Sequence, residues 1–196
     1  MKTKNHPLKI SKTFIYLFTF MCSLTMFSQT YTLNNESSEL SVFGTSSLHD
    51  WEVVAKKQSG SITVDKSGEI PAITSLDFKV VAESLDSGKS AMDKNTYKAL
   101  KTDKYKSIDF KLTKVNAITA KENGVYSVKT TGNLTIAGVT NSIALNFTLT
   151  LTDNKTKLTG SYSFKMTQFK IDPPTAMFGA ITTGDELKIE FKTILQ

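Results

Sequence analysis

One short run, Ser47–Trp51, gathers most of the residues that could do chemistry. It reads Ser-Leu-His-Asp-Trp and holds the chain's single tryptophan. His49 is the only histidine beyond the N-terminal segment, and Asp50 follows it directly. A histidine beside a carboxylate can act as a general base, whereas a tryptophan can line an apolar cavity with its polar N–H at the rim. A tryptophan that begins a strand also commonly packs in a core, so all three interpretations stay open.

Several common residue patterns of catalysis do not occur, and no particular pair of carboxylates is indicated. The chain has neither a G-x-S-x-G nucleophile turn nor a glycine-rich phosphate loop. Its one cysteine, Cys22, excludes a disulfide scaffold and a cysteine-rich zinc site. All 24 basic residues are lysines, which argues against a nucleic-acid reader because the usual grip on guanine needs arginine. We therefore expect no catalytic residue, metal, cofactor or nucleic-acid partner.

Two further clusters combine glycine, proline and large apolar residues. The run Gly132–Thr140 predicts a tight turn at Gly138 and a bulge or close backbone approach at Gly132. In the run Phe169–Gly179 two prolines are expected to stop the strand that contains Met166. The same run places Met177-Phe178 in a loop, where these side chains should cap a barrel mouth or touch a ligand.

The elements that position these clusters are mostly strands. Apolar and polar residues alternate with a period of two in 76–80, 108–112, 143–151, 158–166 and 187–195. Such alternation is typical of antiparallel sheet with one buried face. We expect eight or nine evenly spread strands, a spacing that favours a barrel or a sandwich. The inward faces are expected to carry Phe78, Phe110, Leu134, Ile136, Leu145, Phe147, Tyr162, Phe164 and Phe191. The alternation alone does not decide which face of each strand is the inner one.

One helix is expected at residues 91–101, with Ser90 as its N-cap and Asp93 completing an approximate capping box. Met92, Tyr97 and Leu100 fall on one face of this helix. A helix between strands can cover the end of a barrel or pack on the outside of the sheet. The sequence does not decide between these two positions.

Residues 1–28 have the order of a secretory signal peptide: a lysine-rich start, an apolar run and small residues near Ser28. Four lysines and no acids lie in this segment, so the net charge of +6 falls to +2 for residues 29–196. We expect cleavage near Ser28, with an uncleaved N-terminal anchor as the alternative, and one domain over 29–196 without a membrane span. The location is then periplasmic, or outside the cell, and an exported chain without disulfides suits a bacterial envelope.

An ordered set of motifs carries a resemblance to a known family. The set runs from Thr45–Trp51 through Met92-Asp93 and Tyr105–Phe110 to Gly132–Thr140. It resembles the YceI-like family of exported proteins, and the segments 49–51 and 173–176 are similar to the branch common in Bacteroidetes-type bacteria. This chain has Lys106 where many members have proline, and Met166 and Gln168 where many have charged residues. No headgroup contact is therefore carried over.

The resemblance implies an all-β fold, an eight-stranded antiparallel lipocalin-like barrel with one short helix. It also implies an elongated apolar tunnel for a long isoprenoid or similar chain, in a protein that is mostly periplasmic and has no established catalytic residues. We therefore predict a non-enzymatic binding or carrier protein for a polyisoprenoid, quinone or related lipid. The residues expected to contribute are Trp51, Met92, Tyr97, Phe110, Phe169 and Phe178 as apolar lining and His49 at a polar rim.

Two other functions remain as alternatives. A barrel filled with side chains would act as an interaction module that binds another envelope protein. An enzyme acting on a lipid would use His49 and Asp50 as a base pair, and would need a nucleophile or substrate beside them. The sequence does not decide whether the protein forms a homodimer.

Overall fold

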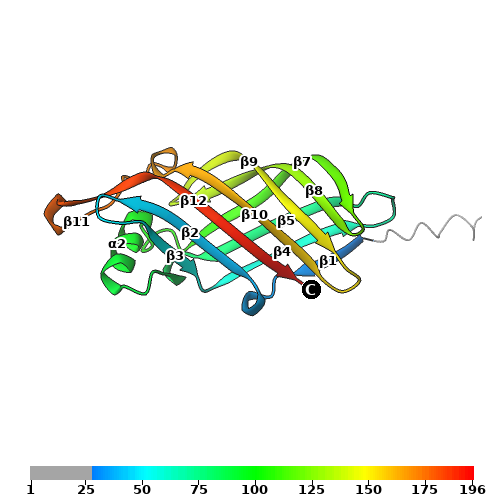
Figure 1. Cartoon of the computed structure of the whole chain (residues 1–196), viewed down its shortest axis with the longest axis horizontal. Helices are drawn as coiled ribbons and strands as arrows, with labels where there is room; N and C mark the ends of the chain where they lie inside the picture. Colours follow the sequence, from blue (N-terminus) through cyan, green and yellow to red (C-terminus); the bar gives the residue numbers. More distant parts are fainter. Residues whose placement is uncertain (1–27) are drawn as a thin grey trace, which may run out of the picture.

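The computed structural model describes residues 28–196, which form a curled antiparallel sheet with one α-helix at its end (Figure 1). Eight long strands make up the wall. They are β2 (Glu39–Ser46), β4 (Gln58–Asp65), β5 (Ala72–Val81), β7 (Ser107–Glu122), β8 (Val125–Ile136), β9 (Val139–Leu151), β10 (Thr156–Lys165) and β12 (Ile181–Leu195). The shorter elements are β1 (Ser28–Thr32), β3 (Trp51–Ala55), β6 (Leu85–Asp86), β11 (Thr175–Ala176), the helix α2 (Ser90–Leu100) and the 3₁₀ turns η1 (Asn35–Ser37), η2 (Ala82–Ser84), η3 (Met166–Phe169) and η4 (Met177–Gly179).

The long strands lie side by side in the order β4-β5-β7-β8-β9-β10-β12-β2, and each pairs with antiparallel neighbours. The sheet closes at β12, because one edge of this strand bonds to β2 over most of its length and to the end of β1 beyond it. β2 pairs along Thr183–Lys192, and beyond it Thr32 exchanges two backbone hydrogen bonds of 3.0 and 2.9 Å with Gln196. The predicted eight-stranded antiparallel barrel with one short helix is confirmed, with four short strands in addition.

Both glycine predictions for the β8–β9 hairpin are confirmed. Ala137 and Gly138 adopt positive φ values of 48° and 78°, as a two-residue turn between Ile136 and Val139 requires. At Gly132 an added Cβ would overlap the ring of Phe110 and would lie 2.9 Å from the backbone oxygen of Lys111. The register of β7 against β8 also shifts just past this point. Gly132 therefore lets the aromatic ring lie directly over the neighbouring strand.

The helix α2 begins at Ser90, one residue earlier than expected, and the predicted cap is wrong. Lys89 occupies the N-cap position without a side-chain bond. The Asp93 carboxylate instead accepts hydrogen bonds from the backbone N–H of Ser87 at 2.8 Å and from its hydroxyl at 2.6 Å. Asp93 thus ties the helix to the segment before it rather than closing its own first turn.

The prolines do not stop the strand that precedes them. β10 ends at Lys165, and the chain passes at once into the 3₁₀ turn η3, well before Pro173. Lys170, with φ 55°, closes that turn. Met166 therefore belongs to the turn, and Pro173 and Pro174 lie in an irregular segment that leads to β11.

Side chains fill the half of the barrel that lies away from α2. At this end the turns β7–β8 and β9–β10 meet β1 and the C-terminus (Figure 1). Six apolar side chains there are at most 1 % exposed: Tyr31, Ile62, Val64, Val128, Leu149 and Leu195. The barrel is thus sealed at this end, and free interior space is left to the half next to the helix. The predicted signal peptide falls on residues that lie, apart from Ser28, outside the described range.

Candidate functional site

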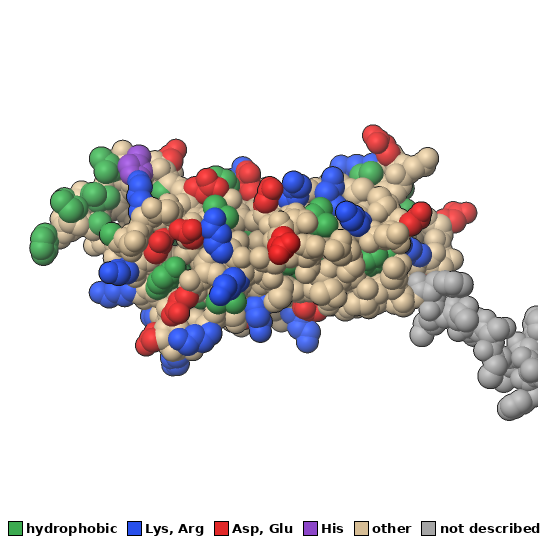
Figure 2. All heavy atoms as spheres, turned by 90° about the horizontal axis from the view of Figure 1, so that it is seen from below, with side chains coloured by type: hydrophobic (Ala, Val, Ile, Leu, Met, Phe, Trp, Pro, Cys, Tyr) green, Lys and Arg blue, Asp and Glu red, His purple; other side chains and the backbone are tan. Residues whose placement is uncertain are grey.

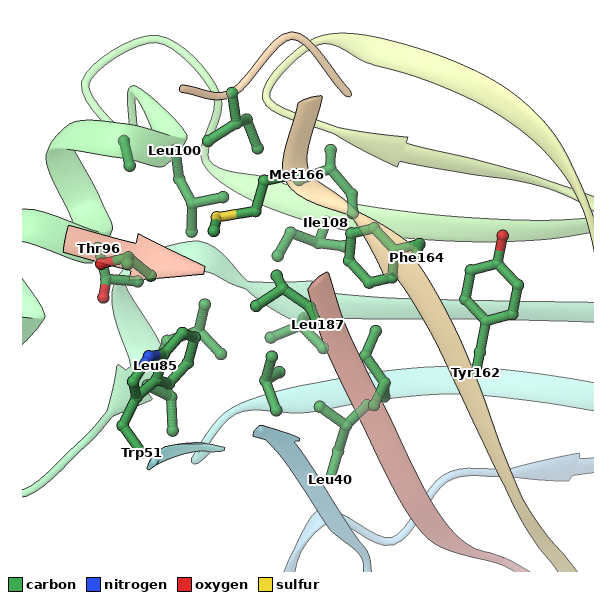
Figure 3. A pocket seen from close by; sticks show the side chains of 18 of the residues that line it. Leu40, Trp51, Leu85, Thr96, Leu100, Ile108, Tyr162, Phe164, Met166 and Leu187 are labelled. Carbon is green, nitrogen blue, oxygen red and sulfur yellow. The ribbon is translucent and has the colours of Figure 1, made fainter. Parts of the chain in front are cut away.

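A cavity of about 440 Å³ lies in the half of the barrel next to α2. In Figure 3 the side chains of Trp51, Met166 and Leu187 point toward one another across this space. All nine side chains expected on the inward strand faces line it, and that prediction is confirmed: Phe78, Phe110, Leu134, Ile136, Leu145, Phe147, Tyr162, Phe164 and Phe191. The structure therefore decides which face of these alternating strands is the inner one.

The chemistry of the wall is almost entirely apolar. Among the described residues that line the cavity there is no carboxylate, and Lys89 is the only lysine. His49 and Lys89 both belong to segments at the helix end, so the two basic side chains of the lining are at the mouth. Within the wall, burial raises the pKa of the Tyr162 phenol above 10.0, and its ring stacks on Phe164 at 5.8 Å. Such a wall can hold hydrocarbon but offers no partner for a buried charge.

The helix α2 covers the open end of the barrel. Ala91, Met92, Thr96 and Leu100 all line the cavity, and Leu100 is buried. This arrangement identifies α2 as a cover over the barrel end, which decides between the two positions left open by the sequence.

Tyr97 fastens this cover. Its hydroxyl donates a 2.8 Å hydrogen bond to the backbone oxygen of Leu85, a residue of the cavity wall. The pKa of Tyr97 is raised, first by burial and then by the nearby carboxylates of Asp93, Asp86 and Glu83. The phenol therefore stays protonated and keeps its donor over the whole physiological range.

The loop between β2 and β3 forms another part of the mouth. Ser46 shapes the loop, because its hydroxyl accepts from the N–H of Leu48 and His49 and donates 2.7 Å to the His49 oxygen. The Trp51 indole N–H donates 2.9 Å to the Thr45 oxygen, which leaves the ring to cover Gly44 and face the cavity.

The His49 ring does not meet the Asp50 carboxylate. Its Nδ1 lies 2.7 Å from the backbone oxygen of Asp50 instead. The base pair that an enzyme would need is therefore not formed here.

Four predicted site residues lie in the cavity wall: Trp51, Met92 and Phe110 as apolar lining, and His49 at the mouth. Three others lie elsewhere, and the prediction is corrected for them. Tyr97 turns toward Leu85, as described above. Phe169 is 1 % exposed but packs edge-on against Phe164 at 5.2 Å, behind the wall. Phe178 is fully exposed, because η4 carries it out into solvent at the end of a hairpin.

Sequence reasoning missed part of the mouth. Ile171 lines the cavity from the irregular segment before the prolines, and Ala176 of β11 and Ile181 at the start of β12 line it after them, where no periodicity indicated it. Leu48 and Lys89 also reach the cavity. For Lys89 the one available signal was its place directly before the helix.

A carboxylate braces the mouth from the outer side. Asp185 accepts hydrogen bonds from the Thr167 N–H at 3.0 Å and from the Thr167 hydroxyl at 2.7 Å. These bonds, hydroxyl first, hold the pKa of the Asp185 carboxyl below its usual value of 3.8. They fix η3 to the irregular stretch of β12 between Thr183 and Leu187, and thereby the position of Met166 in the wall.

Residues 28–196 hold no group of three or more His, Cys, Asp or Glu side chains that could bind a metal ion. Among the helices of these same residues, none is both long enough and apolar enough to cross a bilayer.

Comparisons with known proteins agree on a family and a fold. A profile for the YceI-like domain matches residues 31–195. Among solved structures, BcnA of Burkholderia cenocepacia superposes with a TM-score of 0.66 at 18 % identity, over 84 % of this chain and 99 % of that one. A polyisoprenoid binding domain from Saccharophagus degradans, implicated in plant cell wall breakdown, gives 0.67 at 12 % identity, over 85 % and 97 %.

The YCEI protein of Campylobacter jejuni is also similar, with a TM-score of 0.54 at 23 % identity over 72 % of this chain and 82 % of that one. At these identities the structural likeness shows the fold alone. A comparison with curated proteins gave no match. The profile, however, spans nearly all of the described residues, from the second half of β1 to the end of β12. The chain therefore belongs to the family of YceI-like domain proteins.

Proposed function

We propose that this protein binds a long apolar chain, a polyisoprenoid, quinone tail or related lipid, and carries it without altering it chemically. The observation that carries the proposal is the cavity, whose wall is almost entirely apolar and holds no carboxylate among the described residues. A polar ligand would lose its hydrogen bonds with water on entering such a space and would find few replacements.

The size of the cavity fits this class of ligand. Its volume of about 440 Å³ falls within the roughly 300–1,000 Å³ that is typical of small-molecule sites. Each buried methylene contributes about 0.8 kcal/mol, so ten of them would contribute about 8 kcal/mol before ordering costs. That corresponds to a dissociation constant of roughly micromolar, reached without a single polar contact.

Three further points support the proposal. The Saccharophagus degradans domain, which shares the fold, is described as polyisoprenoid binding. The His49 ring contacts a backbone oxygen rather than the Asp50 carboxylate, so binding is preferred over turnover. Side chains fill only the half of the barrel away from α2. The alternative function, an interaction module with a fully filled barrel, is therefore less well supported than lipid binding.

The place of action is part of the proposal. Residues 1–28 have the composition of a secretory signal, and we propose that the protein works in the periplasm after this segment is removed. A lipid chain that leaves a membrane there would need an apolar container to pass through water.

The test uses Trp51, the only tryptophan of the chain, as a reporter inside the cavity wall. The full chain is expressed in a bacterium, purified without detergent and titrated with a long-chain isoprenoid quinone. We expect a saturable change in tryptophan fluorescence, and none with a quinone of the same headgroup that lacks the isoprenoid chain. An unchanged spectrum with both quinones would contradict the proposal.

A further inference from the structure

Large apolar side chains are exposed at the end of the molecule that holds the cavity mouth. Among residues 28–196, Leu48 is 67 % exposed, Met177 72 %, and Phe178 fully exposed. Figure 2 shows hydrophobic side chains gathered at this end, on the left, whereas charged side chains are spread along the body. We call Leu48, Met177 and Phe178 the apolar tip.

The three side chains project from two loops that are joined to each other. β11 pairs with the start of β12, and the loop Met177–Ala180 connects the two strands. The β2–β3 loop is attached to this hairpin through Ser47, whose N–H donates 2.9 Å to the Thr182 oxygen. In return the Thr182 N–H donates 3.1 Å to the Ser47 hydroxyl. The apolar tip is thus a surface formed by two hydrogen-bonded loops, and not a single exposed side chain.

Two residues of the tip have an unfavourable backbone conformation although their side chains are exposed. Met177 and Phe178 have φ values of 51° and 57°, in the left-handed region that bulky residues avoid. Neither side chain gains burial within the folded chain in return. Strain and exposure combined at one place point to a contact outside the molecule.

The absence of charge from the hairpin indicates what kind of surface it contacts. Residues 173–184 contain no ionisable side chain, so the whole hairpin can enter an apolar phase without burying a charge. Among residues 28–196, the one charged side chain that lines the cavity is basic, Lys89, and lysine suits the anionic surface of a membrane. Large apolar side chains on an uncharged loop are suited to insertion at a bilayer interface.

The tip also continues into the cavity wall. Leu48 belongs to both, and Ala176 and Ile181, which flank the hairpin loop, line the cavity as well. A lipid chain that moved along this surface would stay in apolar contact from a bilayer to the barrel interior. Leaving through water would instead expose every methylene of the chain.

We propose that the apolar tip inserts into the surface of a lipid bilayer and seats the cavity mouth against it, so that the ligand passes directly between membrane and barrel. The inference rests on the proposed function, because it gives the tip a purpose in loading the cavity. It goes beyond that function by making a membrane surface the docking partner.

The experiment measures co-flotation of the purified full chain with vesicles of equimolar phosphatidylethanolamine and phosphatidylglycerol. The test variant is Met177→Ser with Phe178→Ser, which removes both side chains of the hairpin loop. The control is Ile70→Ser, because Ile70 is also an exposed apolar residue (51 %) but lies in the β4–β5 turn at the opposite end. Burial of the two removed side chains implies at least about a tenfold loss of vesicle affinity for the double variant, and no change for the control.

A second readout separates this inference from the proposed function. The same proteins are titrated with isoprenoid quinone delivered from solvent, with Trp51 fluorescence as the signal. We expect the double variant to bind this quinone as the unaltered protein does, but to take it up from vesicles at least about tenfold more slowly. Absence of vesicle binding by the unaltered protein, or equal binding by the double variant, would overturn the inference while quinone binding from solvent still upheld the proposed function. In that case the tip would be assigned to a protein partner.

Discussion

At the scale of single residues, Gly132 decides how closely two strands approach. The Phe110 ring, which lines the cavity, lies over this glycine, and an added Cβ would also stand 2.9 Å from the Lys111 oxygen. We expect Gly132→Ala to lower the free energy of unfolding by about 1–3 kcal/mol, because the ring must move within a packed wall. Urea denaturation measures this. Gly68→Ala is the control, since its nearest contact would be an ordinary 3.4 Å to the Ile70 oxygen. Equal stabilities of the two variants would contradict the account.

Asp185 makes the mouth sensitive to acid. Because the hydroxyl and N–H of Thr167 lower its pKa below the unfolded value of 3.8, the ionised carboxylate stabilises the fold above that pH. The contribution is lost as the pH falls through the lower, folded value. We therefore expect Asp185→Asn to be less stable than the unaltered protein at neutral pH and to approach it in acid.

Thermal unfolding between neutral pH and about pH 2 measures this dependence. Asp153→Asn removes a carboxylate from an exposed turn and serves as the control. A stability difference for Asp185→Asn that did not change with pH would count against the role given to Thr167.

Some residues of the site could be predicted because a simple period located them. Phe110 lies on an alternating strand, and Met92 on the apolar face of the helix. Phe169 and Phe178 could not be placed in this way, because each sits in a 3₁₀ turn where neither the strand period nor the helix period holds. Tyr97 shares the helix face, but its hydroxyl reaches the Leu85 oxygen, and a sequence does not show such a partner.

At the scale of elements, α2 covers the cavity, and the hydrogen bond from Tyr97 to Leu85 fastens it to the cavity wall. We expect Tyr97→Phe, which removes the donor to the Leu85 oxygen, to cost about 0.5–1.5 kcal/mol of stability. Because the helix then opens more readily, bound quinone should dissociate faster. Stopped-flow fluorescence of Trp51 measures this rate. Tyr126→Phe, on β8 at the opposite end of the barrel, is the control. An unchanged dissociation rate in Tyr97→Phe would show that the ligand does not leave past the helix.

Strands and helix could be predicted with different success. Alternation found the long strands because antiparallel strands with one wet face must alternate, but it did not decide which of the two faces is inward. The helix was found within one residue, but its cap was not, because Asp93 bonds to Ser87 outside the helix. The two-residue strands β6 and β11 exist only through their partners Val54–Ala55 and Ile181–Thr182, and no local signal marks them.

At the scale of the whole molecule, the barrel is divided into a filled half and a hollow half. Leucine, isoleucine, valine and aromatic residues line both halves, so composition along the strands does not distinguish them. The difference arises where distant segments meet, as Tyr31 of β1 does when it packs in the sealed end beside Leu195. Sequence could therefore predict a barrel but not which end is open.

A side chain that occupies the hollow half should weaken binding strongly while leaving the fold intact. Leu145 lines the cavity, whereas its neighbour Ala144 on β9 is exposed on the outer face. We expect Leu145→Trp to lower the affinity for isoprenoid quinone by at least about tenfold and to change stability by less than about 1.5 kcal/mol, since the cavity has room for the ring. Ala144→Trp should bind normally. Retained lipid in native mass spectra of Leu145→Trp would place the ligand elsewhere.

The central claim, that the cavity holds a lipid chain, is tested most directly by native mass spectrometry of the full chain after purification from a bacterial envelope without detergent. The intact mass also reports whether residues 1–28 have been removed and whether the protein is a monomer or a dimer. We predict a discrete added mass that extracts into organic solvent and fragments as an isoprenoid chain. A mass equal to that of the polypeptide alone, unchanged after incubation with isoprenoid quinones, would contradict the account.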